Sequence, residues 1–562
     1  MLRKLLVAFA ALVLLPALLV AQDGKLRGRV TDRESGEALI GANVVIEGTG
    51  SGAATDVNGE FIILSVPPGV YTVKVTYIGY SSTTISNLRV SSNITTTQDF
   101  QLASSAVQIQ AVEIIAERPL IQRNTTNTVR ITQSEDVQYI PFRGVQAYVG
   151  LSAGTVTQGG QLYIRGGRAG EIAYYVDGAN VTNPLGMSES VSLIREAIEE
   201  IQLQSGGFTA EYGGANSGII RSSMRTGGSQ FKISLDYLTD DFAKPGKEFL
   251  GTTARGYKNA VATISGPLTN GVRFFLADQY SYVRNGQAMF LEPFIFEGLK
   301  TDAFGSRRVG DPLPGPIEFK KNYGYNNWSW NNTAQGNMQF DLNQLANVPI
   351  KLRLSGNYST SRSIGGGSWP GSLGNYFRKE GKRGLSDGNS AFGNLRLTHF
   401  LSQTTFYELG LSYLRNWGRG YDRDFGDDWI KYPDSVANAQ LGYTGYGGYG
   451  WVNRYVGPPN LSSIYTFQFT DPDAPNNSYS KYKQTNIGMT IDLTSQVTSR
   501  WELKAGGAID SWVYRSWGIG SVSGYLRWID PNLDGVPDPD NIVYGADLNK
   551  GVTLEHARRA RI

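Results

Sequence analysis

Cysteine is absent from the 562 residues, and histidine occurs only twice, as His399 and His556. The absence of cysteine excludes disulfides, thiol nucleophiles and cysteine-ligated zinc. Two histidines far apart in the sequence leave almost no material for a Ser-His-Asp triad or a histidine-rich metal site. An enzyme is therefore a minority hypothesis.

Charge is also scarce. Charged residues make up 18% of the chain, and 52 Lys and Arg against 49 Asp and Glu leave a formal net charge of +3. Such a small net charge does not indicate nucleic-acid binding. No long apolar run follows residue 21, which excludes a helical transporter. Glycine (68 residues) and tyrosine (31) are abundant, which favours a largely β protein that meets lipid or ligand through aromatic rings.

The N-terminus has the pattern of a secretory signal peptide over residues 1–21. Arg3 and Lys4 precede an apolar run from Leu5 to Val20. An uncleaved membrane anchor is the alternative, but it requires about 20 apolar residues and this run falls just short. We therefore expect export from the cytoplasm.

Residues 25–103 contain short strand patterns separated by turn residues, which predicts a small β-sandwich. Four stretches of this block resemble the carboxypeptidase regulatory-like domain: 28–32, 39–44, 55–61 and 68–71. The block has no histidine and no cluster of metal ligands, so the resemblance implies no peptidase activity. We interpret it as an accessory binding or spacer module.

The linker, residues 104–128, contains one short apolar stretch with β propensity, which ends before Pro119. An extended peptide of this kind can add to the sheet of another protein through main-chain hydrogen bonds. A plain linker strand is the alternative. The candidate docking residues are Val112, Glu113, Ile114, Ile115 and Ala116.

Residues 129–228 mix strand patterns with a helical pattern, which predicts an α+β domain. The helix is expected over Ser190–Glu200, where Val191, Ile194 and Ile198 recur at i, i+3 and i+7.

Several ordered motifs in this block resemble the plug domain of TonB-dependent outer-membrane receptors. They are the stretches 162–167, 172–178, 183–184, 197–203, 206–213 and 218–220. With this neighbour, the docking stretch resembles the TonB box of that family. The resemblance implies that TonB and its inner-membrane energising complex are partners.

Two charged residues of the plug block, Arg165 and Glu211, are candidates for a latch. Inside a polar barrel lumen they would hold plug to wall through charge-assisted hydrogen bonds. Solvated loop positions are the alternative.

From residue 229 to 562, apolar and polar residues alternate, as in Phe231, Ile233 and Leu235 against Lys232 and Ser234. Such strands, with aromatic ends, short turns and very long loops, favour a lipid-facing barrel wall, although a soluble sandwich shows the same alternation. Roughly ten strand candidates compare with about 22 in the resembled family, so we expect part of a longer receptor. The predicted fold is mainly β: an N-terminal β-sandwich, an α+β plug and the first ~10 strands of an antiparallel transmembrane β-barrel.

Two long, aromatic and Gly-rich stretches, 285–333 and 417–480, are expected on the outer side. Rings there could stack on sugars or hydrophobic ligands, and the alternative is that they pack on each other. The candidate ligand residues, all in the second stretch, are Tyr421, Trp429, Tyr443, Tyr446, Tyr449, Trp451 and Tyr455.

A turn near the end of the chain places side-chain oxygens at alternating positions around Gly535, as calcium loops do. The candidate Ca²⁺ ligands are Asp530, Asn532, Asp534 and Asp538. The turn lacks the helices and the final Glu of an EF-hand, so a solvated turn is the default. No other cofactor is expected.

The sequence thus predicts an outer-membrane receptor with periplasmic N-terminal domains, which imports an external ligand with energy from TonB. The alternatives are a surface ligand-binding or sensing protein without transport, and a non-functional fragment. An N-terminal sandwich of this type resembles the arrangement in receptors that import oligosaccharides or peptides with a lipoprotein lid. We therefore expect outer-membrane lipid, a surface lipoprotein and a small-molecule or oligomer ligand as partners, and no nucleic acid.

Overall fold

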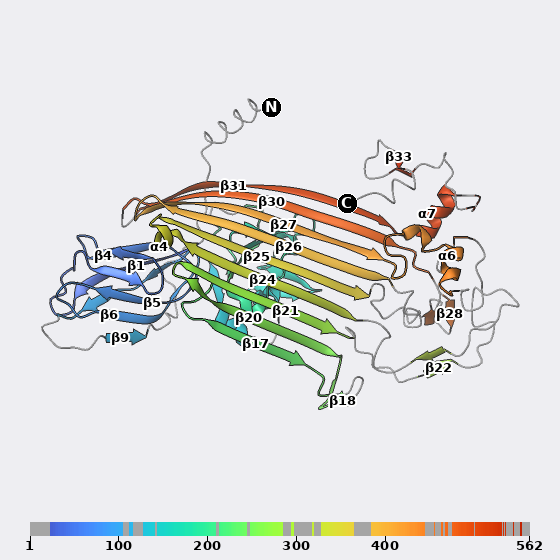
Figure 1. Cartoon of the computed structure of the whole chain (residues 1–562), viewed down its shortest axis with the longest axis horizontal. Helices are drawn as coiled ribbons and strands as arrows, with labels where there is room; N and C mark the ends of the chain where they lie inside the picture. The colour runs from blue at the N-terminus through green and yellow to red at the C-terminus, as the bar shows by residue number, and fades with distance from the viewer. Residues whose placement is uncertain are drawn as a thin grey trace, which may run out of the picture.

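The computed structural model divides into a sandwich, a plug and a curved wall of strands (Figure 1). It describes residues 23–104, 112–115, 128–140, 143–208, 213–243, 248–284, 294–296, 317–319, 328–364, 384–443, 454–455, 462–464, 467–469, 475–498, 501–530, 532, 534, 543–544 and 551–552.

The N-terminal domain is a sandwich of two small sheets. One contains β1 (Gly24–Asp32), β4 (Glu60–Val66), β7 (Thr95–Thr97) and β8 (Phe100–Leu102). The other runs in the order β3 (Gly52–Ala54), β2 (Asn43–Ile46), β5 (Gly69–Thr76), β6 (Thr83–Val90) and β9 (Val112–Ile115). Alternate residues of these strands, such as Val44, Val73 and Val75, are fully buried between the sheets. The predicted sandwich is confirmed.

The plug is a five-stranded sheet with short helical turns. The sheet order is β10 (Val129–Gln133), β15 (Ile198–Gln204), β16 (Gly218–Met224), β13 (Ile172–Val176) and β14 (Ala179–Asn180). Around it lie α2 (Ser134–Tyr139), α3 (Val145–Val149), the hairpin of β11 (Thr155–Gln158) and β12 (Gln161–Ile164), and the 3₁₀ turns η1 (Ala169–Glu171) and η2 (Arg195–Ala197).

The helix predicted over Ser190–Glu200 is wrong. Only η2 is helical there, and β15 begins at Ile198. All seven residues of β15 are buried, because it lies between β10 and β16 in the middle of the sheet. The apolar spacing that suggested a helix belongs to a chain buried on both faces.

Among the described residues, the wall is a sheet of nine antiparallel strands that pair in the order in which they occur in the sequence. They are β17 (Lys232–Thr239), β20 (Tyr257–Thr269), β21 (Val272–Val283), β24 (Ser329–Asp341), β25 (Ile350–Ile364), β26 (Leu385–Phe400), β27 (Thr405–Tyr421), β30 (Tyr479–Gln496) and β31 (Glu502–Ile519). The outer strands β17 and β31 lie at the two ends of this order. The wall is therefore part of a barrel, as the alternating pattern predicts.

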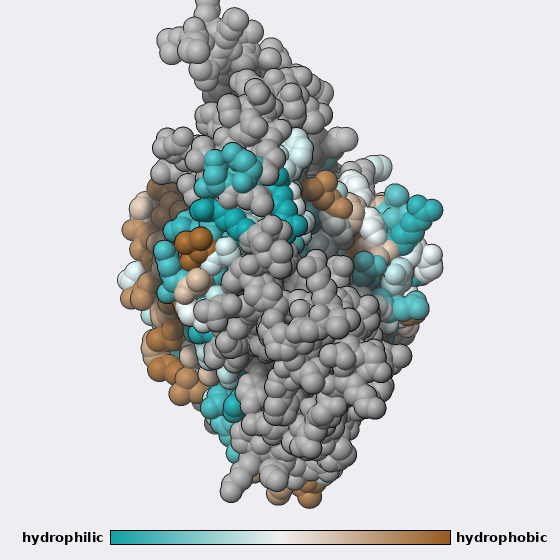
Figure 2. All heavy atoms as spheres, turned by 90° about the vertical axis from the view of Figure 1, so that its right-hand side faces the viewer, coloured by the Kyte–Doolittle hydropathy of each residue, from teal (hydrophilic) through white to brown (hydrophobic). Residues whose placement is uncertain are grey.

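Side chains alternate between the two faces of the wall. Leu276 and Tyr358 are exposed on the outer face, whereas Gln335 and Asn357 are buried on the inner face. Figure 2 shows apolar side chains gathered along one flank of the molecule. An apolar outer face and a polar inner face suit a wall that separates lipid from a polar lumen.

Connections at one end of the wall are short, and the sandwich lies at this end (Figure 1). One of them carries α4 (Leu342–Ala346). Connections at the other end are long. They contain η5 (Trp429–Lys431), α6 (Ser435–Gln440) and the strand pairs β18 (Glu248–Phe249) with β19 (Thr252–Thr253), β22 (Phe294–Phe296) with β23 (Ile317–Phe319), and β28 (Ser462–Ile464) with β29 (Phe467–Phe469). At the same end, α7 (Val522–Ile529) and the pair β32 (Val543–Tyr544) with β33 (Gly551–Val552) follow β31. Among the described residues, no helix has the length and apolarity needed to cross a membrane.

Candidate functional site

The predicted docking stretch is a short strand at the edge of the sandwich. Strand β9 runs parallel to β6, with Thr83 opposite Val112 and Ser86 opposite Ile115. It is the last strand in the order of its sheet among the described residues. A peptide in this position already has the extended backbone that strand addition requires. Ala116 lies outside the described residues, and the docking role stays a prediction.

The plug is held in the wall by hydrogen bonds from wall side chains to plug backbone carbonyls. Asn357 Nδ2 donates to the Ser192 carbonyl over 2.8 Å. Asn416 Nδ2 donates to the Ser190 carbonyl over 3.2 Å. Such contacts depend on backbone position rather than on the plug side chain.

Gln335 of β24 both accepts a hydrogen bond from the plug backbone and donates one to it. Its Oε1 accepts from the Ile194 amide over 3.0 Å, and its Nε2 donates to the Ala197 carbonyl over 3.4 Å. One wall side chain thus satisfies both ends of the turn that precedes β15. Tyr514 adds a further contact by donating to Asn183 Oδ1 over 2.6 Å.

Ion pairs complete the contact between plug and wall. Arg195 and Arg143 of the plug reach Asp236 of β17 over 3.2 and 3.8 Å. Arg195 also pairs with Glu196, its neighbour in the chain, over 2.7 Å. The sequence analysis did not single out these residues; the available signal was an acidic residue, Asp236, on the polar face of β17.

The structure describes only one of the two predicted latch residues, Arg165. Arg165 is exposed in a turn of the plug, where its amide donates to the Gly154 carbonyl over 2.8 Å. No ion pair joins Arg165 to a wall strand in the part of the chain that the structure describes. Glu211 lies outside that part. The latch role of these two residues stays a prediction.

Three of the predicted ligand rings belong to a packed cluster at the loop end. Tyr421, Trp429 and Tyr455 are 7%, 1% and 2% exposed. They pack with Tyr432, Tyr479 and residues of α7. In this arrangement the rings contact each other, which is the alternative that the sequence left open, so they present little surface to a ligand.

Tyr443 differs from these rings because it is half-buried, and its hydroxyl donates to Asp424 Oδ2 over 3.3 Å. Tyr446, Tyr449 and Trp451 lie outside the described residues. A ligand role for the aromatic loop stays a prediction.

Side chains of the candidate calcium turn form hydrogen bonds with one another and with a neighbouring loop residue. Asp530 is 2% exposed, and its Oδ2 accepts from the Tyr455 hydroxyl over 3.0 Å. Burial and this hydrogen bond raise the pKa of Tyr455 to about 12. Asn532 Nδ2 donates to Asp534 Oδ2 over 2.9 Å. Asp538 lies outside the described residues, and no group of three or more acidic or histidine side chains suited to a metal occurs among those described.

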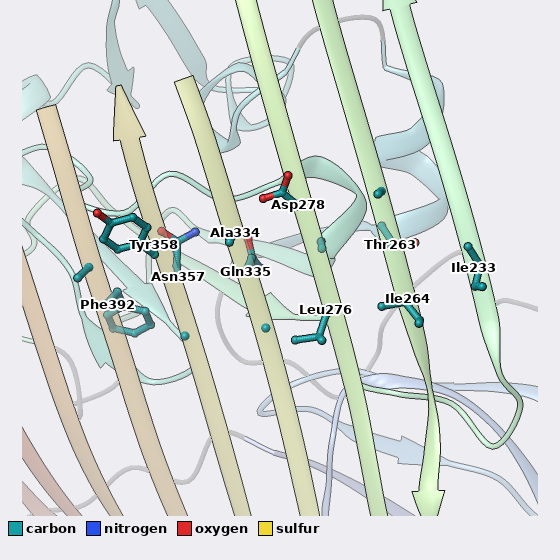
Figure 3. Close-up of a pocket in the computed structure, with 15 residues that line it drawn as sticks. Ile233, Thr263, Ile264, Leu276, Asp278, Ala334, Gln335, Asn357, Tyr358 and Phe392 are labelled. Atoms are coloured by element: carbon teal, nitrogen blue, oxygen red, sulfur yellow. The ribbon is translucent and has the colours of Figure 1, made fainter. Parts of the chain in front are cut away.

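A hollow of about 750 Å³ opens on the wall across β17 to β26 (Figure 3). Leu276, Gly336 and Gly356 lie opposite one another in neighbouring strands and line it. Leu276 is 49% exposed, so this row belongs to the outer face, and the two glycines leave the space. An apolar hollow on that face suits acyl chains, and we assign no receptor ligand to it.

Two family models match the chain. Residues 26–114 match the CarboxypepD_reg-like domain, and residues 108–219 match the TonB-dependent Receptor Plug Domain. The two matches overlap at residues 108–114, which include most of β9.

Two curated relatives are similar to part of the chain. The chain is 24% identical over 250 residues to the TonB-dependent transporter Oar of Myxococcus xanthus, covering 42% of this chain and 23% of Oar. It is 28% identical over 274 residues to the TonB-dependent receptor SusC of Bacteroides thetaiotaomicron, covering 46% of this chain and 27% of SusC. The matches thus span about a quarter of the length of these relatives.

Among solved structures, the outer membrane transporter YddB from Escherichia coli matches with 12% identity and a TM-score of 0.42. The match covers 69% of this chain and 48% of that chain.

Proposed function

We propose that the chain is part of a TonB-dependent outer-membrane receptor with periplasmic N-terminal domains, and that this receptor imports an external ligand with energy from TonB. The matches to the CarboxypepD_reg-like and TonB-dependent plug domain models, and the two curated relatives, support this proposal. The ligand binds at the loop end of the wall. TonB docks at β9, at the opposite end.

The observation that carries this proposal is the polar contact between plug and wall. The inner face of the wall is rich in side-chain amides, among them Gln335, Asn357 and Asn394, and these bind plug backbone groups. Water can replace such hydrogen bonds at small net cost, about 1 kcal/mol each. A plug held mainly in this way can shift when pulled and return afterwards.

The connection between docking strand and plug supports the direction of the pull. Residues 116–128 separate β9 from β10, the first strand of the plug sheet. Thirteen residues span at most about 45 Å when extended. A pull on β9 therefore reaches the plug at Val129, beside β15.

For the ligand, we propose an oligomer, such as an oligosaccharide or a peptide, delivered with a surface lipoprotein. The proposal rests on the N-terminal sandwich, which resembles the arrangement of receptors with such ligands.

The test replaces Ile114 with proline, which removes one backbone donor from β9. The variant Ile114→Val is the matched control. We expect Ile114→Pro to lose binding to the periplasmic domain of TonB and uptake of labelled oligosaccharides or peptides, while surface binding of the same probes persists. Normal uptake by Ile114→Pro would contradict import driven through β9. Surface binding without uptake in the native receptor would instead favour capture or sensing.

A further inference from the structure

The sandwich contacts the plug through the end of strand β6. Arg89 Nη2 donates to both carboxylate oxygens of Glu135, one of them over 2.6 Å, and Arg89 Nη1 donates to Glu199 Oε1 over 3.1 Å. Glu135 belongs to α2 and Glu199 to β15. One arginine of the sandwich therefore binds two separate elements of the plug, with charge-assisted hydrogen bonds.

Ser92, which lies two residues after the end of β6, makes a second set of contacts with the plug. The Ser92 amide donates to Glu200 Oε1 over 2.8 Å, and its carbonyl accepts from Gln202 Nε2 over 2.8 Å. The hydroxyls of Ser92 and Ser223 are 3.0 Å apart. Glu200 and Gln202 are 0% and 1% exposed, so the centre of this contact is buried but polar. A polar surface remains soluble when the two domains separate.

The sandwich also contacts the wall. Lys351 Nζ of β25 donates to Ser51 Oγ over 2.7 Å, and Lys25 pairs with Glu502 of β31. Leu64 packs against Phe406 of β27. The sandwich thus spans the joint between plug and wall, and the plug cannot move within the wall unless one of the two sets of contacts breaks.

The two sets differ in chemistry. The wall contact includes an apolar cluster, in which Ile62 and Phe400 also pack beside Leu64 and Phe406. Exposing such a cluster to water is unfavourable, and apolar side chains cannot offset this free energy by forming hydrogen bonds with water. The plug contact consists of hydrogen bonds and ion pairs that water can replace. The plug contact is therefore the one that opens.

Strand β6 links this contact to the docking strand. Its first half, Thr83–Ser86, pairs with β9, and Arg89 follows three residues later in the same strand. A load on β9 is therefore passed along β6 directly to Arg89.

We propose that the contact of Arg89 and Ser92 with the plug is a periplasmic latch, which a pull on β9 opens before the plug leaves the wall. The latch deepens the proposed function and rests on it, because TonB supplies the pull. The sandwich stays on the wall, and its separation from Glu199 and Glu200 frees the plug sheet.

The experiment pulls full-length receptor in lipid nanodiscs by a single cysteine placed at Gln110, ahead of β9. The 562 residues contain no cysteine, so the attachment is unique among them. The measured quantity is the rate of the first release event at constant load. We expect Arg89→Glu to raise this rate on the order of tenfold or more, because a charge pair within an interface governs dissociation.

Two further variants make the result specific. Arg89→Glu combined with Glu135→Arg restores one of the two pairs of opposite charges but leaves a carboxylate facing Glu199, so it is expected to recover part of the native rate. Arg29→Glu is the matched control, since Arg29 Nε donates to the Asn58 carbonyl within the sandwich. An unchanged rate in Arg89→Glu, or an equal rise in Arg29→Glu, would overturn the latch.

The cysteine handle separates this inference from the proposed function. The pull needs no TonB, so the latch is tested even if TonB fails to bind β9. A second series uses the periplasmic domain of TonB as the handle. Release through the cysteine with the expected dependence on Arg89, together with no attachment through TonB, would retain the latch as a contact and refute the energy source.

Discussion

The side-chain amide of Asn394, on the inner face of the wall, donates a 2.8 Å hydrogen bond to the backbone carbonyl of Asp177 in the plug. Arg396 Nη2 donates to the same carbonyl over 3.0 Å. Asp177 has a φ of 43°, and its own carboxylate accepts from the Met224 amide over 2.9 Å. This left-handed turn, which aspartate tolerates better than most residues, is fixed from both sides.

The contacts of Arg396 predict that replacing Arg396 alone destabilises the protein more than replacing Arg396 together with its partner Glu408. Arg396 also pairs with Glu408, which is 0% exposed, over 3.4 Å. Arg396→Met leaves that carboxylate buried without its cation, and we expect a loss of roughly 3–5 kcal/mol in the free energy of unfolding. Arg396→Met with Glu408→Gln should recover most of the loss. Urea unfolding in micelles measures both, and equal stabilities of the single and double variants would contradict the prediction.

The contact between sandwich and plug predicts that two cysteines introduced there form a disulfide. The hydroxyls of Ser92 and Ser223 are 3.0 Å apart, so cysteines at both positions have side chains that face each other within bonding reach. We expect Ser92→Cys with Ser223→Cys to oxidise in the periplasm. Gel mobility before and after reduction detects the closed loop. The pair Ser92→Cys with Ser217→Cys is the control, and cross-linking there but not at Ser223 would mean that the sandwich sits differently.

The ring cluster at the loop end predicts a structural role for Trp429. This side chain is 1% exposed, and its ring lies 5.6 Å from that of Trp517. We expect Trp429→Ala to lower the free energy of local unfolding of this cluster by about 3–5 kcal/mol, because apolar burial is lost and a cavity is left behind. Limited proteolysis of whole cells is expected to cut the loop of this variant faster. Tyr443→Ala, at a half-buried position, serves as the comparison, and equal cutting of the two variants would argue against the cluster.

The sandwich is expected to lose stability in strong acid through Asp32. Backbone amide donation from Ser35, aided by the Tyr80 hydroxyl and the Glu34 amide, lowers the pKa of Asp32 to about 2. Because the folded pKa lies below the unfolded value of about 3.9, the contribution is complete above about pH 4 and is lost as the pH falls through about 2. The stability difference between native receptor and Asp32→Asn should therefore shrink between these two values. A difference that is constant with pH would rule out this role.

Local patterns were sufficient for the fold class. Alternation in stretches such as Phe231–Leu235 predicts a half-buried strand, because successive side chains point to opposite faces. The same reasoning failed at Ile194 and Ile198, since a buried strand and an amphipathic helix can share apolar positions over one short window. It was also unable to choose between ligand binding and packing for Tyr421 and Tyr455.

What the sequence by itself determined is the chemistry available to the protein: no cysteine, little charge, alternating strands and the ordered motifs of a plug. Only the tertiary structure decided which groups meet. Asn394 and Asp177 are 217 positions apart in the chain, and Ser92 and Ser223 are 131 apart. Periodicity shows which face of an element a side chain lies on. Which residue of another domain it contacts depends on how elements distant in the sequence pack together, and no local pattern contains that information.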